Sequence, residues 1–279
     1  MKKISRRSFL AAAGLSVAAL ALTACGGSSA STASSVASSA ASSEAASTSA
    51  AAGELATVEA GKLTMATNAT VPPYEMTTDA GEFEGIDIET AQAIADKLGL
   101  ELQIDDMDFD AALLSVQQGK ADIVMAGVTV TDERKAVMDF SDSYATGIQS
   151  IIVPEGSDIA SPDDLAGKKI GTQRGTTGYI YCSDDFGDEN VVAYDDGLTA
   201  VQALNNGQVD AVVIDNAPAK EFVAANPGLV ILDTSYAEED YAIGMAKGSS
   251  LEDAVNAALK ELKADGTLQS IVDKYITAE

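Results

Sequence analysis

Short apolar runs alternate with amphipathic stretches from about residue 61 to the end of the chain. Short apolar runs are typical of buried strands, whereas apolar residues that recur every three or four positions are typical of one helix face. The helical spacing is clearest over residues 88–98, and Gly99 can end that helix. The alternation predicts an α/β fold with mostly parallel sheets. The predicted strands are 62–67, 100–104, 121–125, 169–172, 191–194, 211–214 and 230–232, and residues 109–117 are a further predicted helix.

Three segments carry residues that favour the start of a helix. Thr131 is a good cap because its hydroxyl can accept a hydrogen bond from a free backbone N–H. Ser161 is followed by Pro162, which suits the first helical position. Ser249 and Glu252 have the spacing of a capping box. We expect a helix to begin at each of these places.

The first 59 residues follow a different pattern. Basic residues within 2–7 precede an apolar stretch, 9–22, that is short for a membrane span and typical of an export signal. Residues 22–25 have the form of a lipobox, in which a peptidase cuts before the cysteine and a lipid is joined to its thiol. We predict that residues 1–24 are a lipoprotein signal peptide and that Cys25 is lipidated. The alternative is a plain export signal with a chance cysteine.

Two further features of this region concern export and anchoring. Residues 5–10 resemble a twin-arginine signal, so this route and Sec export both stay open. Residues 25–59 are mostly Ser, Ala, Thr and Gly, which cannot form a core and predict a disordered tether. No other apolar run is long enough to span a membrane. We therefore expect a lipid-anchored protein on the outer face of the cell membrane, facing the periplasm where there are two membranes.

The chain is strongly acidic, with 43 Asp and Glu against 17 Lys and Arg and a net charge of −26. The predicted signal peptide holds four basic residues and no acidic ones, which leaves 13 basic residues and a net charge of −30 after its removal. Because phosphates would be repelled, this charge argues against nucleic acid and anionic lipid as partners. There is no histidine, and Cys182 is the only cysteine besides Cys25, so we expect no cofactor, metal site or intrachain disulfide.

Residues 126–134 join the end of a predicted strand to the start of a predicted helix, and they carry the most specific chemistry. Thr129 and Thr131 lie in the turn, and Arg134 lies one turn into the helix. Free N–H groups at a helix start attract anions, and a guanidinium can hold a carboxylate through two parallel hydrogen bonds. The segment is a candidate trap for a small carboxylate, although an ordinary strand–turn–helix with a surface salt bridge fits it equally well.

Further motifs occur in order around this segment. They include Gly-x-Thr-x-Thr-x-x-Arg at 127–134 and Asp-Phe-Ser-x-x-Tyr at 139–144, and the others are residues 107–109, 113, 119–122, 175–177, 209–215 and 262–268. Together they resemble the bacterial extracellular solute-binding proteins for polar amino acids, which are the capture components of ABC importers. The resemblance runs from about residue 61 to residue 275.

The resemblance implies a two-lobe periplasmic-binding-protein-like fold of type II, with hinge strands at 145–153 and 241–246. Lobe 1 would comprise residues 60–145 and 244–279, and lobe 2 residues 148–240. A free amino acid would bind between the lobes, and their closure would create the surface that an ABC permease in the cytoplasmic membrane recognises. We expect a monomer, and a binding protein rather than an enzyme.

The resemblance also implies which residues hold the charged ends of the amino acid. Arg134 would bind the carboxylate, assisted by Thr129 and by the backbone of Gly127 and Thr177. Asp215 matches the aspartate that pairs with the ammonium group. An Asp at a strand end also suits a helix cap, and the two roles are compatible.

The remaining site residues would surround the ligand side chain. Phe109 matches a ring that packs against it, although a core position is the alternative. Asn68 and Val71 stand where relatives often carry an aspartate and an aromatic residue. Both departures favour a neutral amino acid, because they remove an acidic partner and a stacking ring. Gln173 could shift this preference, and Arg174 could accept an acidic side chain.

Two other classes of function stay open at this point. Some proteins of this fold are dehydratases that act on cyclic amino acids, and release of product from arogenate or prephenate would identify one. The second class is a ligand-sensing partner of a membrane receptor, although this chain has neither its own spanning helix nor a fused signalling domain.

Overall fold

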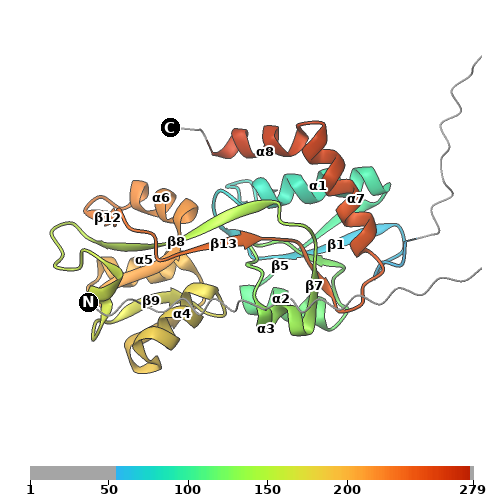
Figure 1. Cartoon of the computed structure of the whole chain (residues 1–279). Helices are drawn as coiled ribbons and strands as arrows, with labels where there is room; N and C mark the ends of the chain where they lie inside the picture. The colour runs from blue at the N-terminus through green and yellow to red at the C-terminus, as the bar shows by residue number, and fades with distance from the viewer. Residues whose placement is uncertain (1–54, 277–279) are drawn as a thin grey trace, which may run out of the picture. The chain divides into compact units, whose positions relative to one another are not determined.

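The computed structural model describes residues 55–276 (Figure 1). The predicted signal peptide, Cys25 and the tether up to residue 54 lie outside the described residues, as do residues 277–279. All described residues belong to one structural unit, Ala51–Glu279. Within it, two large sheets with their helices form two lobes.

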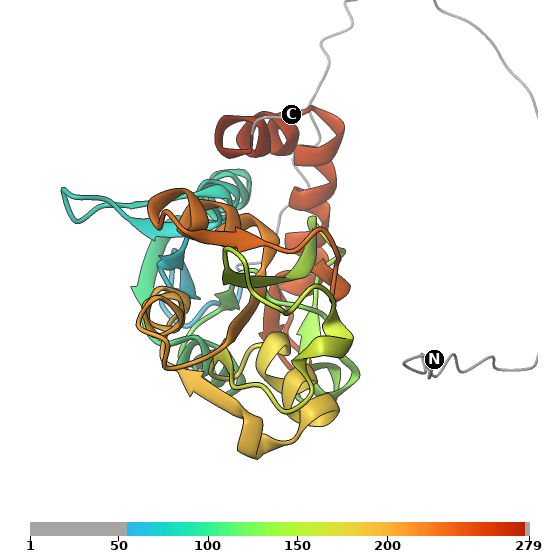
Figure 2. The same ribbon diagram turned by 90° about the vertical axis from the view of Figure 1, so that its left-hand side faces the viewer.

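The first lobe is built on a five-stranded sheet with the order β5-β1-β6-β14-β7. Helices α1, α7 and α8 contact one another beside this sheet, and Figure 2 shows the three together. The strands are β1 (Lys62–Thr67), β5 (Glu101–Asp106), β6 (Ile123–Val124), β7 (Met138–Phe140) and β14 (Gly244–Ala246). The helices are α1 (Ile86–Leu98), α2 (Phe109–Gln117), α3 (Asp132–Val137), α7 (Glu252–Ala264) and α8 (Thr267–Tyr275). A small sheet adds β2 (Thr70–Val71), β3 (Glu75–Thr77) and β4 (Phe83–Glu84).

The second lobe is built on a sheet with the order β10-β9-β11-β8-β12, to which β13 adds by pairing with β8. Helices α4, α5 and α6 pack against this sheet. The strands are β8 (Ala145–Pro154), β9 (Ile170–Gln173), β10 (Val191–Tyr194), β11 (Ala211–Asp215), β12 (Leu229–Ile231) and β13 (Ala237–Tyr241). The helices are α4 (Thr177–Phe186), α5 (Gly197–Asn205) and α6 (Asn216–Ala225), with 3-10 turns η1 (Pro162–Leu165) and η2 (Asp188–Asn190).

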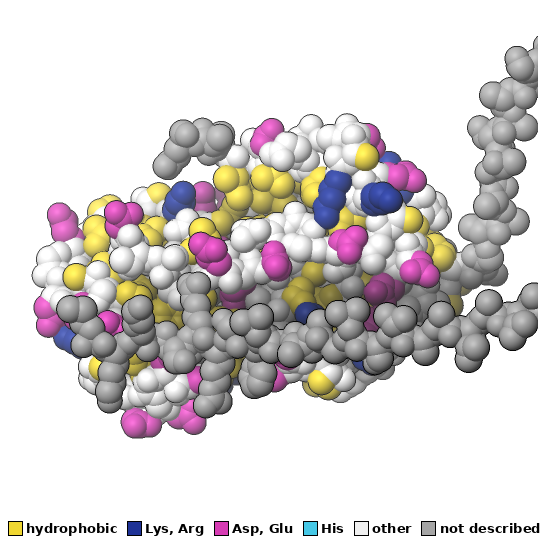
Figure 3. Space-filling model, viewed as in Figure 1, with side chains coloured by type: hydrophobic (Ala, Val, Ile, Leu, Met, Phe, Trp, Pro, Cys, Tyr) yellow, Lys and Arg dark blue, Asp and Glu magenta, His cyan; other side chains and the backbone are white. Residues whose placement is uncertain are grey.

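Each lobe has its own hydrophobic core. Leu63, Met65 and Ile94 belong to a buried cluster of the first lobe, whereas Ile152 and Val212 belong to a cluster of the second. Separate cores allow the lobes to move relative to each other without loss of either core. Most of the described acidic residues are at least partly exposed, and Figure 3 shows Asp and Glu side chains scattered over the visible face. Five acidic residues are buried: Glu75, Asp87, Asp122, Asp215 and Glu239.

The chain crosses between the lobes twice. It leaves the first sheet after β7 and enters the second at β8, and it returns between β13 and β14. Strands β8 and β13 run antiparallel side by side, from Ala145↔Tyr241 to Gln149↔Ala237 (Figure 1). A two-lobe α/β fold with a hinge of two strands is therefore confirmed. The predicted bounds 241–246 of the second hinge strand are wrong, because β13 ends at Tyr241 and β14 begins at Gly244. Gly147 lies on this hinge, and any side chain there would overlap the ring of Tyr241.

The sheets are mixed, so the prediction of mostly parallel sheets is wrong. Pairs β1–β5, β1–β6, β9–β10 and β9–β11 are parallel, as expected for strands joined through helices. The strands next to the crossings, β8 and β14, are antiparallel to all their partners. Strands β8 and β14 follow the two crossings between the lobes, and each runs opposite to the neighbouring strands of the sheet that it joins. Apolar periodicity along the sequence does not show the direction in which a strand runs.

Most predicted elements are present within one or two residues. Strands β1 and β10 and helix α2 have the predicted bounds. Gly99 ends α1 in the left-handed region at φ 70°, which glycine adopts without steric cost. The predicted strand 121–125 is wrong in extent, because only Ile123 and Val124 form β6. Residues 121–126 are nevertheless all buried, so the apolar run reports burial and not pairing.

Of the three predicted helix starts, only the one at Thr131 is confirmed as predicted. Thr131 caps α3, and its hydroxyl accepts a hydrogen bond from the N–H of Arg134 at 3.1 Å. Ser161 forms a capping box with Asp164, but the turn that follows is only the 3-10 turn η1. The predicted box at 249–252 does not form. The Ser249 hydroxyl accepts from the N–H of Leu251 at 3.2 Å within a turn, and α7 begins only at Glu252.

Candidate functional site

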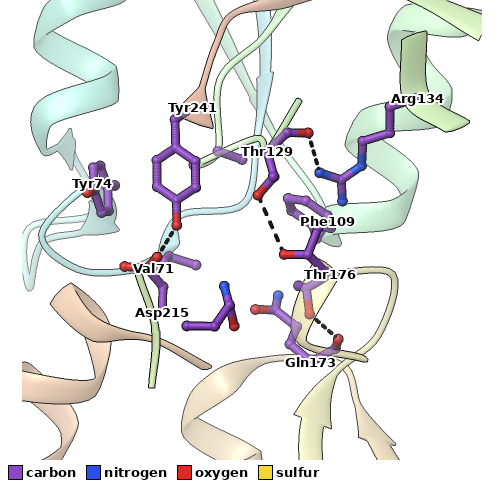
Figure 4. A pocket seen from close by; sticks show the side chains of 13 residues that line it. Val71, Tyr74, Phe109, Thr129, Arg134, Gln173, Thr176, Asp215 and Tyr241 are labelled. Carbon is purple, nitrogen blue, oxygen red and sulfur yellow. Dashed lines mark hydrogen bonds between the residues drawn. The ribbon is translucent and has the colours of Figure 1, made fainter. Parts of the chain in front are cut away.

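A cavity of about 40 Å³ lies between the lobes, where β6, β9 and β11 end (Figure 4). The carboxyl ends of strands are the usual place for ligand sites in α/β proteins. A cavity of this volume has room for only a few water molecules. The lobes are closed over it, because hydrogen bonds from Arg134 to the Gly175 carbonyl and from Gln173 to Asn68 join them. Its lining consists of Val71, Tyr74, Phe109, Ala126, Gly127, Thr129, Arg134, Gln149, Gln173, Thr176, Thr177, Asp215 and Tyr241.

Of the nine predicted ligand residues, all except Asn68 line this cavity. Asn68 is buried behind it, where its carbonyl oxygen accepts a hydrogen bond from the amide nitrogen of Gln173 at 2.8 Å. Its own amide nitrogen donates to the carbonyl of Met107 at 3.0 Å. Asn68 therefore orients Gln173, which belongs to the other lobe, and both the oxygen and the nitrogen of its side-chain amide already form hydrogen bonds within the protein.

Arg134 is the only basic residue that lines the cavity. Its side chain is only 8% exposed, and its guanidinium donates to the carbonyls of Thr129 at 2.8 Å and Gly175 at 3.1 Å. The guanidinium carbon lies 5.4 Å from the centre of the Phe109 ring. Among the described residues, no carboxylate lies within salt-bridge distance of it. Because two carbonyls take only part of its five N–H donors, this buried cation can still bind an anion.

Burial lowers the pKa of Arg134, although a guanidinium remains charged at neutral pH. The start of α4 provides further donors next to it. Thr176 caps this helix, with its hydroxyl accepting from the N–H of Tyr179 at 3.4 Å. The first N–H groups of a helix have no partner within the helix, so those at Thr177 and Gly178 are available to an anion.

Asp215 supplies the opposite charge from the second lobe. It caps α6, because its carboxylate accepts from the N–H of Ala217 at 3.1 Å, so the cap alternative considered from the sequence is correct. Its other oxygen accepts a hydrogen bond from the hydroxyl of Tyr241 (Figure 4). Burial raises the pKa of Asp215 to about 6, and the hydrogen bond from Tyr241 opposes that shift.

Gly127 lines the cavity in a left-handed conformation at φ 55°, close to the ring of Tyr241. Its N–H donates to a carboxylate oxygen of the buried Asp87 at 2.9 Å. The same oxygen accepts from the Tyr144 hydroxyl at 2.8 Å. The expectation that the Gly127 backbone helps to hold a carboxylate therefore needs revision, because this N–H is occupied and only the carbonyl is left to face the cavity.

The predicted site residues did not include five that line the cavity: Tyr74, Ala126, Gln149, Thr176 and Tyr241. Tyr241 and Tyr74 pack edge to face with ring centres 5.5 Å apart. In the segments that contain these tyrosines, an aromatic residue fits a core position as well as a cavity-lining position. The sequence offers no clear signal for Tyr241, because residues 238–240 are all acidic and show no alternation of polar and apolar positions. Only the structure places this ring on the inward face of β13.

A sequence model of the bacterial extracellular solute-binding proteins, family 3, matches residues 63–278. The chain belongs to this family. The family resemblance drawn from the ordered motifs is thus confirmed. Within residues 55–276 of this solute-binding protein, none of the helices is both long and apolar enough to cross a membrane.

Individual relatives agree with the family assignment. The L-cystine-binding protein TcyJ of Escherichia coli (strain K12) is 34% identical over 226 residues, which cover 79% of this chain and 85% of TcyJ. Among solved structures, the arginine-, lysine-, histidine-binding protein ArtJ of Geobacillus stearothermophilus is 34% identical with a TM-score of 0.75, covering 78% of this chain and 96% of ArtJ. An ancestral arginine-binding protein bound to glutamine is 41% identical with a TM-score of 0.75, and the match covers 79% of this chain and 100% of the ancestral protein. These similar proteins are named for different amino acids.

Proposed function

We propose that this protein captures a free amino acid between its two lobes and delivers it to an ABC importer. The observation that carries the proposal is the pair of opposite charges in one cavity. Arg134 offers a buried guanidinium that has no carboxylate partner within residues 55–276, and Asp215 offers a buried carboxylate from the other lobe. A zwitterion with its carboxylate and ammonium on one carbon satisfies both charges at once. The names of the relatives, all amino acid binding proteins, support the same reading.

We propose that the ligand is a neutral amino acid. With its charged ends at Arg134 and Asp215, the side chain would lie against the remaining wall, which includes Val71, Phe109 and Gln173. The rest of the lining carries only uncharged groups, and Asp215 is the only acidic residue among the described residues that line the cavity. A cationic side chain would find no acidic partner there. Arg174 does not line the cavity, and its guanidinium pairs with Asp195 at 3.6 Å.

Lobe closure is the step that converts binding into delivery. We propose that residues 60–145 and 244–279 move as lobe 1 and residues 148–240 as lobe 2, which agrees with the membership of the two sheets. Contacts such as the Arg134–Gly175 hydrogen bond span the lobes and hold the closed form. The cavity of about 40 Å³ must widen to admit an amino acid, so the lobes must open for loading.

We propose that the protein acts as a monomer, with residues 1–24 as its signal peptide and most of residues 25–59 as a tether from a lipidated Cys25. The end of the predicted tether is an exception, because Leu55 packs against the core of the first lobe and the N–H of Val58 donates to Asp122 at 2.7 Å. The lipid would hold the protein on the outer face of the cell membrane, beside the permease, and tethering raises its effective concentration there. Expressed with Cys25→Ser, the protein is expected to leave the membrane fraction and appear soluble. Retention of this variant in the membrane fraction would contradict the anchor.

Neither alternative function gains support. The relatives are named as binding proteins and not as dehydratases, and the cavity shows no acid–base pair beyond Asp215 and Tyr241. A sensing role through a partner receptor would use the same capture step and so shares the same site.

The capture function is tested by thermal unfolding of the purified full chain after denaturation and refolding to remove bound ligand. The twenty standard L-amino acids and L-cystine are added one at a time. A ligand at about 1,000 times its dissociation constant should raise Tm by on the order of 10 °C. We expect a shift with one or a few neutral amino acids. No shift with any of them, for a sample that unfolds cooperatively, would reject the proposal.

A further inference from the structure

A second buried carboxylate, Glu239, lies beside the cavity on hinge strand β13. It is only 6% exposed, whereas its neighbours Glu238 and Asp240 are exposed. The alternation places Glu239 and Tyr241 on the same inward face of the strand. Tyr241 donates to Asp215 from this face, so β13 brings two polar side chains to one part of the site. Sequence reasoning overlooked Glu239, because an acid in the acidic stretch 237–241 looks like a surface residue.

One oxygen of Glu239 gathers donors from three segments. It accepts hydrogen bonds from the hydroxyl of Thr129 at 3.1 Å, the hydroxyl of Thr177 at 3.0 Å and the amide of Gln149 at 3.0 Å. All three donors belong to residues that line the cavity. The two hydroxyl oxygens lie 3.5 Å from each other, which is farther than either lies from Glu239. Because a carboxylate is also the stronger acceptor, both hydroxyl protons point to Glu239.

This arrangement decides what Thr129 and Thr177 can offer to a ligand. A hydroxyl has one proton to donate and two lone pairs that accept. With their protons committed to Glu239, the two hydroxyls can only accept hydrogen bonds from the cavity. They therefore suit a donor such as an ammonium group and cannot donate to a carboxylate. The carboxylate is left to Arg134 and to the free N–H groups at the start of α4.

We propose that Glu239 is a positioning residue that turns the hydroxyls of Thr129 and Thr177 into acceptors for the ligand ammonium. With Asp215, they form the ammonium-binding part of the site. The inference rests on the proposed amino acid capture and revises one part of it, because Thr129 passes from the carboxylate to the ammonium. Glu239 also adds a second negative charge near the ammonium without touching the ligand.

The test compares Glu239→Gln with the wild-type full chain by calorimetry, with Glu238→Gln as the matched control. Both substitutions remove one carboxylate charge from β13, but only Glu239 contacts the threonines. A glutamine amide can donate to a threonine hydroxyl, which turns that hydroxyl proton towards the cavity and against the ammonium. The probes are each amino acid that shifts Tm of the wild type and its des-amino analogue, which is glutaramic acid for glutamine and δ-guanidinovaleric acid for arginine.

We expect Glu239→Gln to weaken binding of the amino acid by at least about tenfold, which is the lower end of the contribution of a hydrogen bond to a charged group. The des-amino analogue has no ammonium, so its affinity should change less than about twofold. The dissociation constant of the analogue divided by that of the amino acid should therefore fall about tenfold or more in Glu239→Gln. In Glu238→Gln this ratio should stay constant. A purely structural role would weaken both probes equally.

Equal weakening of both probes, no change in either, or tighter binding of the amino acid would each overturn the proposal. Should Glu239→Gln not fold, Thr129→Val removes one of the two acceptors directly. That variant is then expected to weaken the amino acid and to spare the des-amino analogue, and equal loss of both would overturn the proposal in the same way. If no amino acid binds the wild type, the capture function itself fails, and this outcome is distinct because it does not involve the variants.

Discussion

Replacing Arg134 with alanine is expected to weaken amino acid binding by at least about 30-fold, which corresponds to the 2–3 kcal/mol typical of removing one partner of a buried charge pair. Arg134 is 8% exposed and has no carboxylate partner among the described residues, so the ligand carboxylate would be its counterion. Isothermal titration with the amino acids that shift Tm measures the effect. Arg134→Lys should also lose affinity, because an ammonium cannot bond a carboxylate and two carbonyls in the same plane.

Arg174→Ala is the matched control for this prediction. Arg174 belongs to the same loop as Gly175, but its side chain is half exposed and pairs with Asp195 at the surface. Its removal should leave affinity nearly unchanged, because exposed ion pairs contribute little. Near-normal affinity in Arg134→Ala, or equal losses in Arg134→Ala and Arg174→Ala, would reject Arg134 as the carboxylate ligand. Thermal unfolding of each variant shows whether the fold is intact.

The elements that could be predicted from the sequence are those whose signal is local. Strand β1, helix α2 and the cap at Thr131 each depend on residues within one or two turns of chain, and each has the predicted form. The failed capping box at Ser249 shows the limit of such signals. A short polar residue before a helix has several backbone donors within reach, and the spacing alone does not determine which one it binds.

The parts that could not be predicted depend on contacts between distant segments. Glu239 bonds Thr129, which is 110 residues away, and Gln149, which is 90 residues away. These contacts exist because β13 pairs with β8 at the hinge, and the direction of that pairing leaves no trace in apolar periodicity. The N–H of Gly127 likewise bonds a distant residue, because it donates to Asp87 on α1, 40 residues away. Sequence motifs therefore predicted eight residues that line one cavity, but not which of their hydrogen-bonding groups remain free.

Replacing Asp215 with asparagine is the second substitution with a large expected effect. The amide keeps the shape and can still cap α6, since asparagine and aspartate are equally good caps. It cannot neutralise an ammonium, so affinity should fall by about 30-fold or more, as for a buried charge partner removed. Asp233→Asn, on an exposed part of the same lobe, provides the matched control and should bind normally.

The pH dependence of binding tests the same residue without a substitution. Burial raises the pKa of Asp215 to about 6, and an ammonium at this site requires the ionised carboxylate. Below pH 6 the proton must leave before the ligand binds, so affinity should be about tenfold lower at pH 5 than at pH 7. This tenfold change should disappear in Asp215→Asn.

The stability of the ligand-free protein should change with pH in the opposite direction. Asp215 and Asp87 both have a pKa raised by burial to about 6, above the unfolded value of about 3.8. Such groups bind more protons in the folded state, so their contribution to stability is complete below about pH 4 and is lost as pH rises through 6. The free protein should therefore unfold at a higher temperature at pH 5 than at pH 7, although it binds its ligand more weakly there.

If Asp215→Asn retained the tenfold loss of affinity at pH 5, the titrating group would be Asp87 or another buried acid, and the assignment of Asp215 to the ammonium would fail.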